Sequence, residues 1–459
     1  MGLQPRTAAF IGVGVAATAC LGYMLYFDYQ RRNNPVLKKK IKKEKKKAEK
    51  EVKKAQEKVK LNTIQIIESV IEAASEETLP STPEEKEKYF MQQVALGEGL
   101  CNKGEAFYND AVLPFYLALR VYPAPMELIM IYQKTVPEPV FQMIINAMAL
   151  DQQKRQNQFY ESFPPKETNT KLAELPAGTN EEGKPVVRRG LVVNRDIAAD
   201  EIIYVEKPIV SGLFPGLEGS HCNLCLKRLN DVKIECPDCD VVAFCSDECL
   251  NHAKEEYHQY ICPQNKKEKN VDALEFHEAL KKNNTKYPSM IARFLSAMVV
   301  EELNKSKEQQ KVGEASFGAW DHVDRFRYLE ISENEETAAE IEMLKKVLGP
   351  KVQGINEFLS KEIYLMLKGK LLFNAYAIPT NSEDIEVEES KEHARKLDNS
   401  EAKHIGAALY KISTYIGQSE DGPNVKIEFE NDAISVRALR EIKEDEELVA
   451  AYSLPVSKK

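Results

Sequence analysis

The first pattern along the chain is an uninterrupted apolar stretch near its start. Residues 7–27, TAAFIGVGVAATACLGYMLYF, contain no charged side chain. At about 1.5 Å per helical residue they span about 30 Å, the thickness of a bilayer core. Only Arg6 precedes the stretch, whereas Arg31, Arg32 and a lysine run follow it, so we expect a single membrane anchor with the bulk of the protein in the cytosol. A cleaved secretory signal would carry the cysteines into an oxidising space, and a transit peptide would be amphipathic, so both fit less well.

Helical periodicity dominates the next hundred residues. The segment 61–74, LNTIQIIESVIEAA, predicts a short amphipathic helix within a linker, and residues 83–160 predict four short helices. Thr82 is a candidate N-cap with Pro83 at the first helical position, and Pro114 is expected to kink or restart the second of these helices. Such antiparallel pairs resemble a single tetratricopeptide-like unit. A lone unit has no neighbour to cover its concave side, so we expect an apolar groove there, although many of its apolar residues must be core.

The pattern changes to alternation in the second half of the chain. Residues 161–184 contain several Pro and Gly residues and are expected to be a linker. The following stretch, RRGLVVNRDIAADEIIYVEKPIV, alternates like strands around a turn, a helical region covers about 270–370, and strand-like alternation returns near the end. Residues 185–455 are therefore predicted to form an α+β domain.

Charge is distributed unevenly along the chain. The 459 residues carry a net charge of −9, yet residues 38–60 alone contain thirteen lysines and four glutamates. We therefore expect a basic leash and linker, 28–82, followed by an acidic body that favours positively charged ligands and argues against nucleic acid as the main partner. The lysine run is predicted to be a solvated helix or spacer, with contact to anionic lipid as the alternative.

Seven of the nine cysteines lie in one short segment, residues 222–262. The segment holds two C-x-x-C pairs, a C-x3-C pair and a closing H-x3-C. Eight such ligands provide two tetrahedral sites, and thiolates with a neutral imidazole suit Zn²⁺. A disulfide-rich secreted fold fits less well, because the chain is long and has a histidine at ligand spacing. The candidate ligands are Cys222, Cys225, Cys236, Cys239, Cys245, Cys249, His258 and Cys262.

This spacing resembles the MYND zinc finger. The resemblance implies two interleaved sites, with Cys222, Cys225, Cys245 and Cys249 on one ion and Cys236, Cys239, His258 and Cys262 on the other. Because protein side chains fill all four positions of each site, both ions are expected to be structural.

The N-terminal third resembles the small presequence receptor of the mitochondrial outer-membrane translocase, especially its fungal form. The resemblance covers about residues 5–150 and includes YFDYQRR, YFMQQVALGEGL and FYLALRVYPAPMELIMIYQKTVPEPVFQMI. It implies a single-pass protein of that membrane, with the N-terminus in the intermembrane space, which binds mitochondrial presequences and works with other translocase subunits. The groove residues implied by the matching motifs are Phe90, Met91, Val94, Ile131 and Tyr132, with Gln133 and Thr135 at the polar edge.

The region from about 185 to 455 resembles the SET fold of SET-and-MYND-type lysine methyltransferases. Its matching features are strand segments split by the cysteine-rich finger and a closing E-E-L-x-x-x-Y motif that ends at Tyr452. That family binds S-adenosylmethionine with a Gly-Arg-Gly turn and an Asn-His pair, and orients the substrate amine with a tyrosine.

The cofactor motifs are altered in this chain. The turn is matched by Arg188, Arg189 and Gly190, and the Asn-His-Ser-Cys motif by Gly417, Gln418, Ser419 and Glu420, whereas Pro423 and Asn424 are retained. No cysteine follows Cys262 to form the later cluster usual in active relatives. We therefore expect a catalytically silent SET-like domain, in which Tyr452 serves packing. The alternative is a membrane-tethered lysine methyltransferase that uses S-adenosylmethionine.

Overall fold

The computed structural model describes residues 63–80, 83–122, 125–179, 183–230, 233–264, 266, 270–307, 317–352, 354–380, 403–419 and 421–452. The predicted anchor, 7–27, and the lysine run, 38–60, lie outside the described residues. Among the helices that are described, none combines the length and the apolar character needed to cross a membrane. The chain forms two compact units that divide between Lys154 and Arg155.

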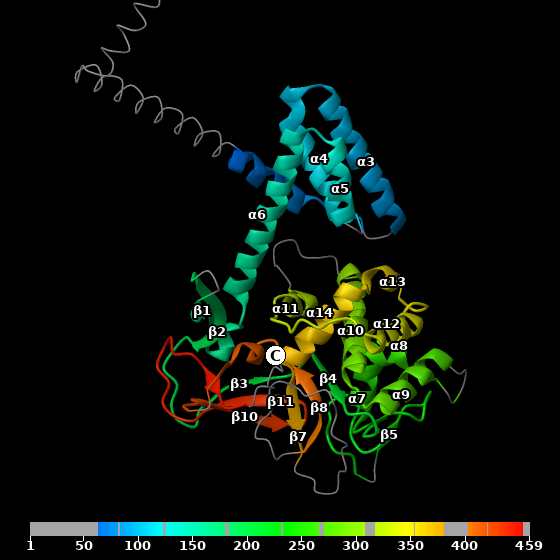
Figure 1. The fold of residues 1–459 in the computed structure, drawn as a ribbon, viewed down its shortest axis with the longest axis vertical. Helices are drawn as coiled ribbons and strands as arrows, with labels where there is room; N and C mark the ends of the chain where they lie inside the picture. The colour runs from blue at the N-terminus through cyan, green and yellow to red at the C-terminus, as the bar shows by residue number, and fades with distance from the viewer. Residues whose placement is uncertain are drawn as a thin grey trace, which may run out of the picture. The chain divides into compact units, whose positions relative to one another are not determined.

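The first unit is entirely helical in its described part (Figure 1). It begins with a helix over residues 63–76. The elements that follow are α3 (Pro83–Asn102), the 3-10 turn η1 (Glu105–Phe107), α4 (Tyr108–Val121), α5 (Pro125–Thr135) and the larger part of α6 (Glu138–Ser162), which continues past the division at Lys154. Helices α3 and α5 both pack on α4. The four helices predicted over 83–160 are thus present, although α6 is longer than the sequence indicated.

The helix over 63–76 belongs to the core of this unit. Its apolar side chains at Ile67, Val70, Ile71 and Ala74 are buried in one cluster with the side chains of α4 and α6. This helix was predicted from the sequence to lie within the linker of residues 28–82. Its short apolar stripe indicated a helix, but the partner that covers the stripe is distant in sequence, so periodicity did not reveal the packing.

Helix α4 continues through Pro114 without interruption. The restart that was the alternative to a kink does not occur, since one helix covers Tyr108–Val121 and Pro114 is itself buried in it. Proline removes one backbone donor. The burial of Phe115, Leu117 and most other side chains of α4 supplies packing energy that offsets this loss.

The region expected to be a linker contains a β-strand. Strand β1 (Thr170–Thr179) pairs antiparallel with β2 (Pro185–Val193), in a register that matches Thr170 with Val193. Of the Pro and Gly residues that suggested a linker, Pro176, Gly178 and Gly183 lie at the hairpin's irregular end, where the register shifts between Pro176 and Thr179. The other two prolines, Pro164 and Pro165, precede β1. Most of β1 is exposed beyond its first residues, which explains its weak apolar pattern.

Three further sheets complete the described β part of the second unit. The largest has the strand order β3-β11-β10-β12-β9, the second has the order β4-β8-β7, and the third consists of β5 and β6. Figure 1 labels β3, β11 and β10 of the largest sheet and all three strands of the second. Alternate residues Ile434, Val436 and Ala438 of β11 are buried, as the alternation in sequence predicts. The strands are β3 (Ile202–Glu206), β4 (Val210–Leu213), β5 (Ile234–Glu235), β6 (Ala243–Phe244), β7 (Tyr376–Pro379), β8 (His404–Leu409), β9 (Gly417–Gln418), β10 (Val425–Glu430), β11 (Ala433–Ala438) and β12 (Val449–Ala450).

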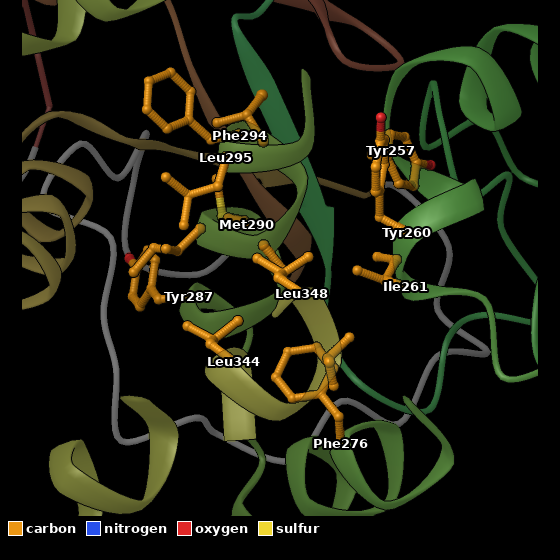
Figure 2. Close-up of a cluster of buried hydrophobic side chains, with 14 of the residues drawn as sticks. Tyr257, Tyr260, Ile261, Phe276, Tyr287, Met290, Phe294, Leu295, Leu344 and Leu348 are labelled. Atoms are coloured by element: carbon orange, nitrogen blue, oxygen red, sulfur yellow. The ribbon is translucent and has the colours of Figure 1, made fainter. Parts of the chain in front are cut away.

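A helical region covers the predicted span of about 270–370. Helix α12 begins with a capping box, in which Asn334 Oδ1 accepts from the Thr337 backbone N–H at 2.8 Å and Thr337 Oγ1 accepts from the Asn334 N–H at 3.0 Å. Figure 2 shows Met290 and Leu295 of α10 with Leu344 and Leu348 of α12 in one buried cluster. The helices are α7 (Asp247–Ala253), the π-helical turn η3 (Lys254–His258), α8 (Gln259–Ile261), α9 (Val271–Asn283), α10 (Tyr287–Lys307), α11 (Ala319–Asp324), α12 (Glu335–Leu348), α13 (Ile355–Phe358) and α14 (Lys361–Asn374).

Candidate functional site

The close packing of α3 on α4 depends on a glycine in α3. A Cβ at Gly97 would lie 2.8 Å from the ring of Phe115, so the absence of a side chain brings the helix backbone directly onto that ring. Val94 and Phe90 lie on the same side of α3, one and two turns earlier respectively, and are half-buried. The Phe90 ring is 4.9 Å from the ring of Tyr122. These two predicted groove residues therefore also contribute to packing.

Helix α5 presents two kinds of apolar residue. Leu128 and Tyr132, one turn apart, are buried, and the Tyr132 ring meets the Phe115 ring edge-on at 5.0 Å. Burial, with a smaller contribution from the carboxylate of Glu98, raises the pKa of the Tyr132 hydroxyl, which therefore stays protonated. Gly97 and Tyr132 both approach this ring, so Phe115 takes part in the packing of both α3 and α5 on α4.

Several apolar side chains of these two helices face solvent. Met91 is 62% exposed and Ile131 is 49% exposed, as binding residues must be. Gln133 and Thr135 are also exposed, and Thr135 Oγ1 donates to the Ile131 carbonyl at 3.0 Å. By contrast Tyr132, another residue of the predicted groove, is only 2% exposed. It can support a groove from below but presents little surface of its own.

Two exposed methionines of α5 were not among the groove residues predicted from the sequence. Met126 and Met130 are 71% and 56% exposed and stand one turn apart on the same face of the helix. Methionine side chains are flexible and polarisable and adapt to varied apolar partners. The signal was present in PMELIMIYQKT, where apolar residues occupy more of the helix surface than one core stripe requires.

The eight candidate metal ligands come together as two groups of four. One group is Cys222, Cys225, Cys245 and Cys249, and the other is Cys236, Cys239, His258 and Cys262. Within each group the ligand atoms lie within 4.8 Å of one another. These sets match the interleaved arrangement implied by the sequence.

The ligand distances in both groups fit a tetrahedral zinc site. A Zn–S bond of about 2.3 Å places two tetrahedral thiolates about 3.8 Å apart. In the first group, Cys245 Sγ lies 3.6 Å from Cys225 Sγ and 3.5 Å from Cys249 Sγ. In the second group, His258 Nε2 lies 3.3 Å from Cys236 Sγ and 3.7 Å from Cys239 Sγ. Each group can therefore hold one structural zinc ion with no position left for a substrate.

Short elements place these ligands. Ser246 caps α7 by accepting the backbone N–H of Cys249 at 3.2 Å, which fixes Cys249 on the first turn of that helix. His258 ends the π-helical turn η3, and its side chain is buried. All four ligands of the second group are buried, whereas in the first group only Cys222 is.

A buried hydrogen-bond network fixes the first metal group to the rest of its unit. The Arg293 guanidinium of α10 donates to the Asn223 carbonyl at 2.7 Å and to its side-chain oxygen at 2.9 Å. The Tyr257 hydroxyl donates to the same carbonyl at 2.9 Å, and the guanidinium stacks over the Tyr257 ring at 4.6 Å. The cysteine-rich segment is thus continuous with the helical core.

The candidate catalytic residue Tyr452 has its hydroxyl engaged. It is 9% exposed, and its hydroxyl donates to the Ile416 carbonyl at 3.0 Å. Its ring packs 6.2 Å from the ring of Tyr376. Both tyrosines line a small, mainly apolar pocket of about 150 Å³ beside β10 and β12.

Taken together, a helical unit with exposed apolar side chains precedes a mixed α/β unit with two cysteine-rich groups suited to metal. A family model described as "MAS20 protein import receptor" matches residues 10–161. The chain belongs to this family of import receptors.

Relatives in the family come from fungi and animals. The mitochondrial import receptor subunit tom20 of Neurospora crassa is 42% identical over 148 residues, which make up 32% of this chain and 81% of the relative. The subunit TOM20 of Saccharomyces cerevisiae is 37% identical over 144 residues, covering 30% and 76% of the two chains. The TOM20 homolog B of Danio rerio is 31% identical over 138 residues, covering 30% and 82%.

Proposed function

We propose that this protein is a mitochondrial outer-membrane import receptor whose helical unit binds amphipathic presequences and passes them to the translocase pore. The observation that carries the proposal is the 42% identity to a mitochondrial import receptor subunit, which falls on the unit with exposed apolar side chains on α3 and α5. The anchor at 7–27 would hold the receptor in the outer membrane with its N-terminus in the intermembrane space. Other translocase subunits would be its partners.

The binding surface is proposed to consist of Phe90, Met91 and Val94 from α3 with Ile131 from α5. Tyr132 would form the floor, and Gln133 and Thr135 the polar edge. Two or three apolar side chains of a presequence helix, at about 1.5–3 kcal/mol each before ordering costs, would give a weak and reversible contact. A receptor that hands its ligand onward requires that reversibility.

A peptide titration tests this surface. A fluorescent amphipathic presequence peptide is titrated against the full chain in detergent micelles. We expect saturable binding with a dissociation constant in the micromolar range, which corresponds to a binding free energy of about −8 kcal/mol. Met91→Ser and Ile131→Ser should each weaken binding about tenfold, because each removes an exposed apolar contact with little effect on the core.

The matched control is Leu96→Ser. Leu96 is 52% exposed on the same helix, but it points roughly 140° away from Met91 around the helix axis. It should leave the affinity unchanged. Absence of saturable binding, or equal effects of Leu96→Ser and Met91→Ser, would contradict the proposed surface.

We further propose that the second unit is a SET-like domain with a MYND-type finger at 222–262, that it holds two structural zinc ions, and that it serves as an interaction scaffold. The support is the pair of four-ligand groups with tetrahedral spacing. The methyltransferase alternative requires a tyrosine hydroxyl available to the substrate amine, whereas that of Tyr452 donates to a backbone carbonyl. Elemental analysis should find two zinc ions per chain.

A further inference from the structure

The residues at the altered cofactor motifs converge on one carboxylate. Strand β2 meets Glu447 through a bridge at Val192, and the Gly417 N–H donates to the Leu448 carbonyl at 2.9 Å. A Cβ at Gly417 would lie 2.4 Å from Glu447 Oε1, and a Cβ at Gly190 would lie 3.2 Å from the same atom. The two glycines therefore flank the Glu447 side chain from two strands.

An arginine completes this arrangement. Arg188 Nη1 lies 2.7 Å from Glu447 Oε1, and Nη2 donates to Oε2 at 2.9 Å, so the ion pair has two contacts. A Cβ at Gly190 would lie 2.8 Å from Arg188 Nη1, which places the guanidinium against that glycine. The side chains of the pair are only 30% and 22% exposed. The space beside both glycines is thus filled by side chains of the chain itself.

Neighbouring polar groups of the motifs are also engaged within the fold. Asn424 is 1% exposed; its amide donates to the Glu447 carbonyl at 2.8 Å and its oxygen accepts from the Val449 N–H at 2.8 Å. Gln418, at the position of the family's histidine, donates to the Tyr452 carbonyl at 2.6 Å. The side-chain amides of Asn424 and Gln418 thus bind the backbone beside strands β9 and β12, and neither is directed at a ligand.

We propose that the Arg188–Glu447 ion pair occupies the place of S-adenosylmethionine between Gly190 and Gly417, and braces β2, β9 and β12 in a closed, non-catalytic domain. The residues present do not fit the cofactor, because the Arg188–Glu447 pair fills the space between the two glycines where the cofactor would lie. This inference rests on the SET-like assignment proposed above and is independent of presequence binding by the first unit.

A double-mutant cycle tests whether the Glu447 side chain fills the space beside Gly417. In the full chain, Gly417→Ala should lower the melting temperature of the second unit by roughly 2–8 °C, because the new methyl group meets Glu447 Oε1. In a Glu447→Ala background the same substitution should cost less than half as much, since the closest contact is gone and only the 3.0 Å approach to Val449 Cγ1 remains. The matched control is Gly422→Ala, where a Cβ meets no atom within 4 Å and no coupling is expected. An equal cost of Gly417→Ala in both backgrounds would overturn the proposal.

A binding measurement on the unmodified chain gives a second, independent readout. Calorimetry with S-adenosylmethionine should show no saturable binding up to about 1 mM. Saturable binding below that concentration would also overturn the proposal, whether or not the Glu447→Ala variant folds. Presequence titration of the same preparation separates this result from a failure of the receptor function. A chain that binds both the peptide and the cofactor would refute the proposal that the ion pair fills the cofactor's place, and would leave the receptor function standing.

Discussion

At the scale of single residues, the helical unit depends on one missing side chain. Gly97 lets α3 rest on the Phe115 ring, and a Cβ there would lie 2.8–2.9 Å from three ring carbons. Phe115 is 1% exposed and part of the unit's core, so the ring has little room to withdraw. Gly97→Ala should therefore destabilise the first unit by about 1–3 kcal/mol, as overpacking does. Hydrogen exchange of α3 and α4 in the full chain measures this loss.

Gly99 of the same helix is the control for that substitution. A Cβ at Gly99 meets nothing within 4 Å, so Gly99→Ala should stabilise α3 by about 0.5–1 kcal/mol through helix propensity alone. If the two substitutions shift exchange in the same direction, close packing at Gly97 is not what limits stability.

The sequence could indicate some residue roles and not others. Spacing identified the eight cysteine and histidine ligands, and the resemblance to the MYND finger implied the two groups that the structure forms. Spacing could not separate Ile131, which is exposed, from its neighbour Tyr132, which is buried, because helical periodicity alone does not say which face meets α4. The role of Glu447 was equally hidden, since its partners Arg188 and Gly417 are distant in sequence.

At the scale of elements, the local pattern predicted whether a segment forms a helix or a strand, but it did not predict what that segment packs against. The four helices after residue 83 and the alternating strands were visible because each carries its own period. Strand β1 was missed because most of its residues are exposed, so its alternation is weak, and because it contains a proline and a glycine. The helix over 63–76 was found, but its place in the core depends on distant partners.

That helix yields a prediction of its own. Ile67→Ala should destabilise the first unit by about 2–5 kcal/mol, because Ile67 is 4% exposed in the cluster with α4 and α6. Ile64→Ala in the same helix should cost little, since Ile64 is 48% exposed. Limited proteolysis of the full chain compares the two variants with the wild type. Equal resistance of all three chains would mean that residues 63–76 are not part of the folded receptor unit.

At the scale of the whole molecule, both groups of candidate metal ligands pack within the second unit. Cys222, Cys236, Cys239 and Cys262 belong to one buried cluster with the apolar side chains of α9, α10, α12 and α14. Lys351, just after α12, donates to the Tyr260 carbonyl at 3.0 Å, and Arg293 of α10 binds the Asn223 carbonyl. The core of the first unit contains no residue of the cysteine-rich segment among those described.

Removal of zinc should therefore unfold one unit and spare the other. A strong chelator withdraws the ions that fold the segment 222–262, which leaves the thiolates buried without a counter-charge and loosens the helices packed on them. Hydrogen exchange should show protection lost in α9, α10 and α12 but retained over residues 83–121, with presequence affinity unchanged, and added zinc should restore the protection. Loss of protection in both units, or in neither, would contradict this division, because the first unit has its own core, whereas the second is proposed to need metal in both ligand groups to complete its own.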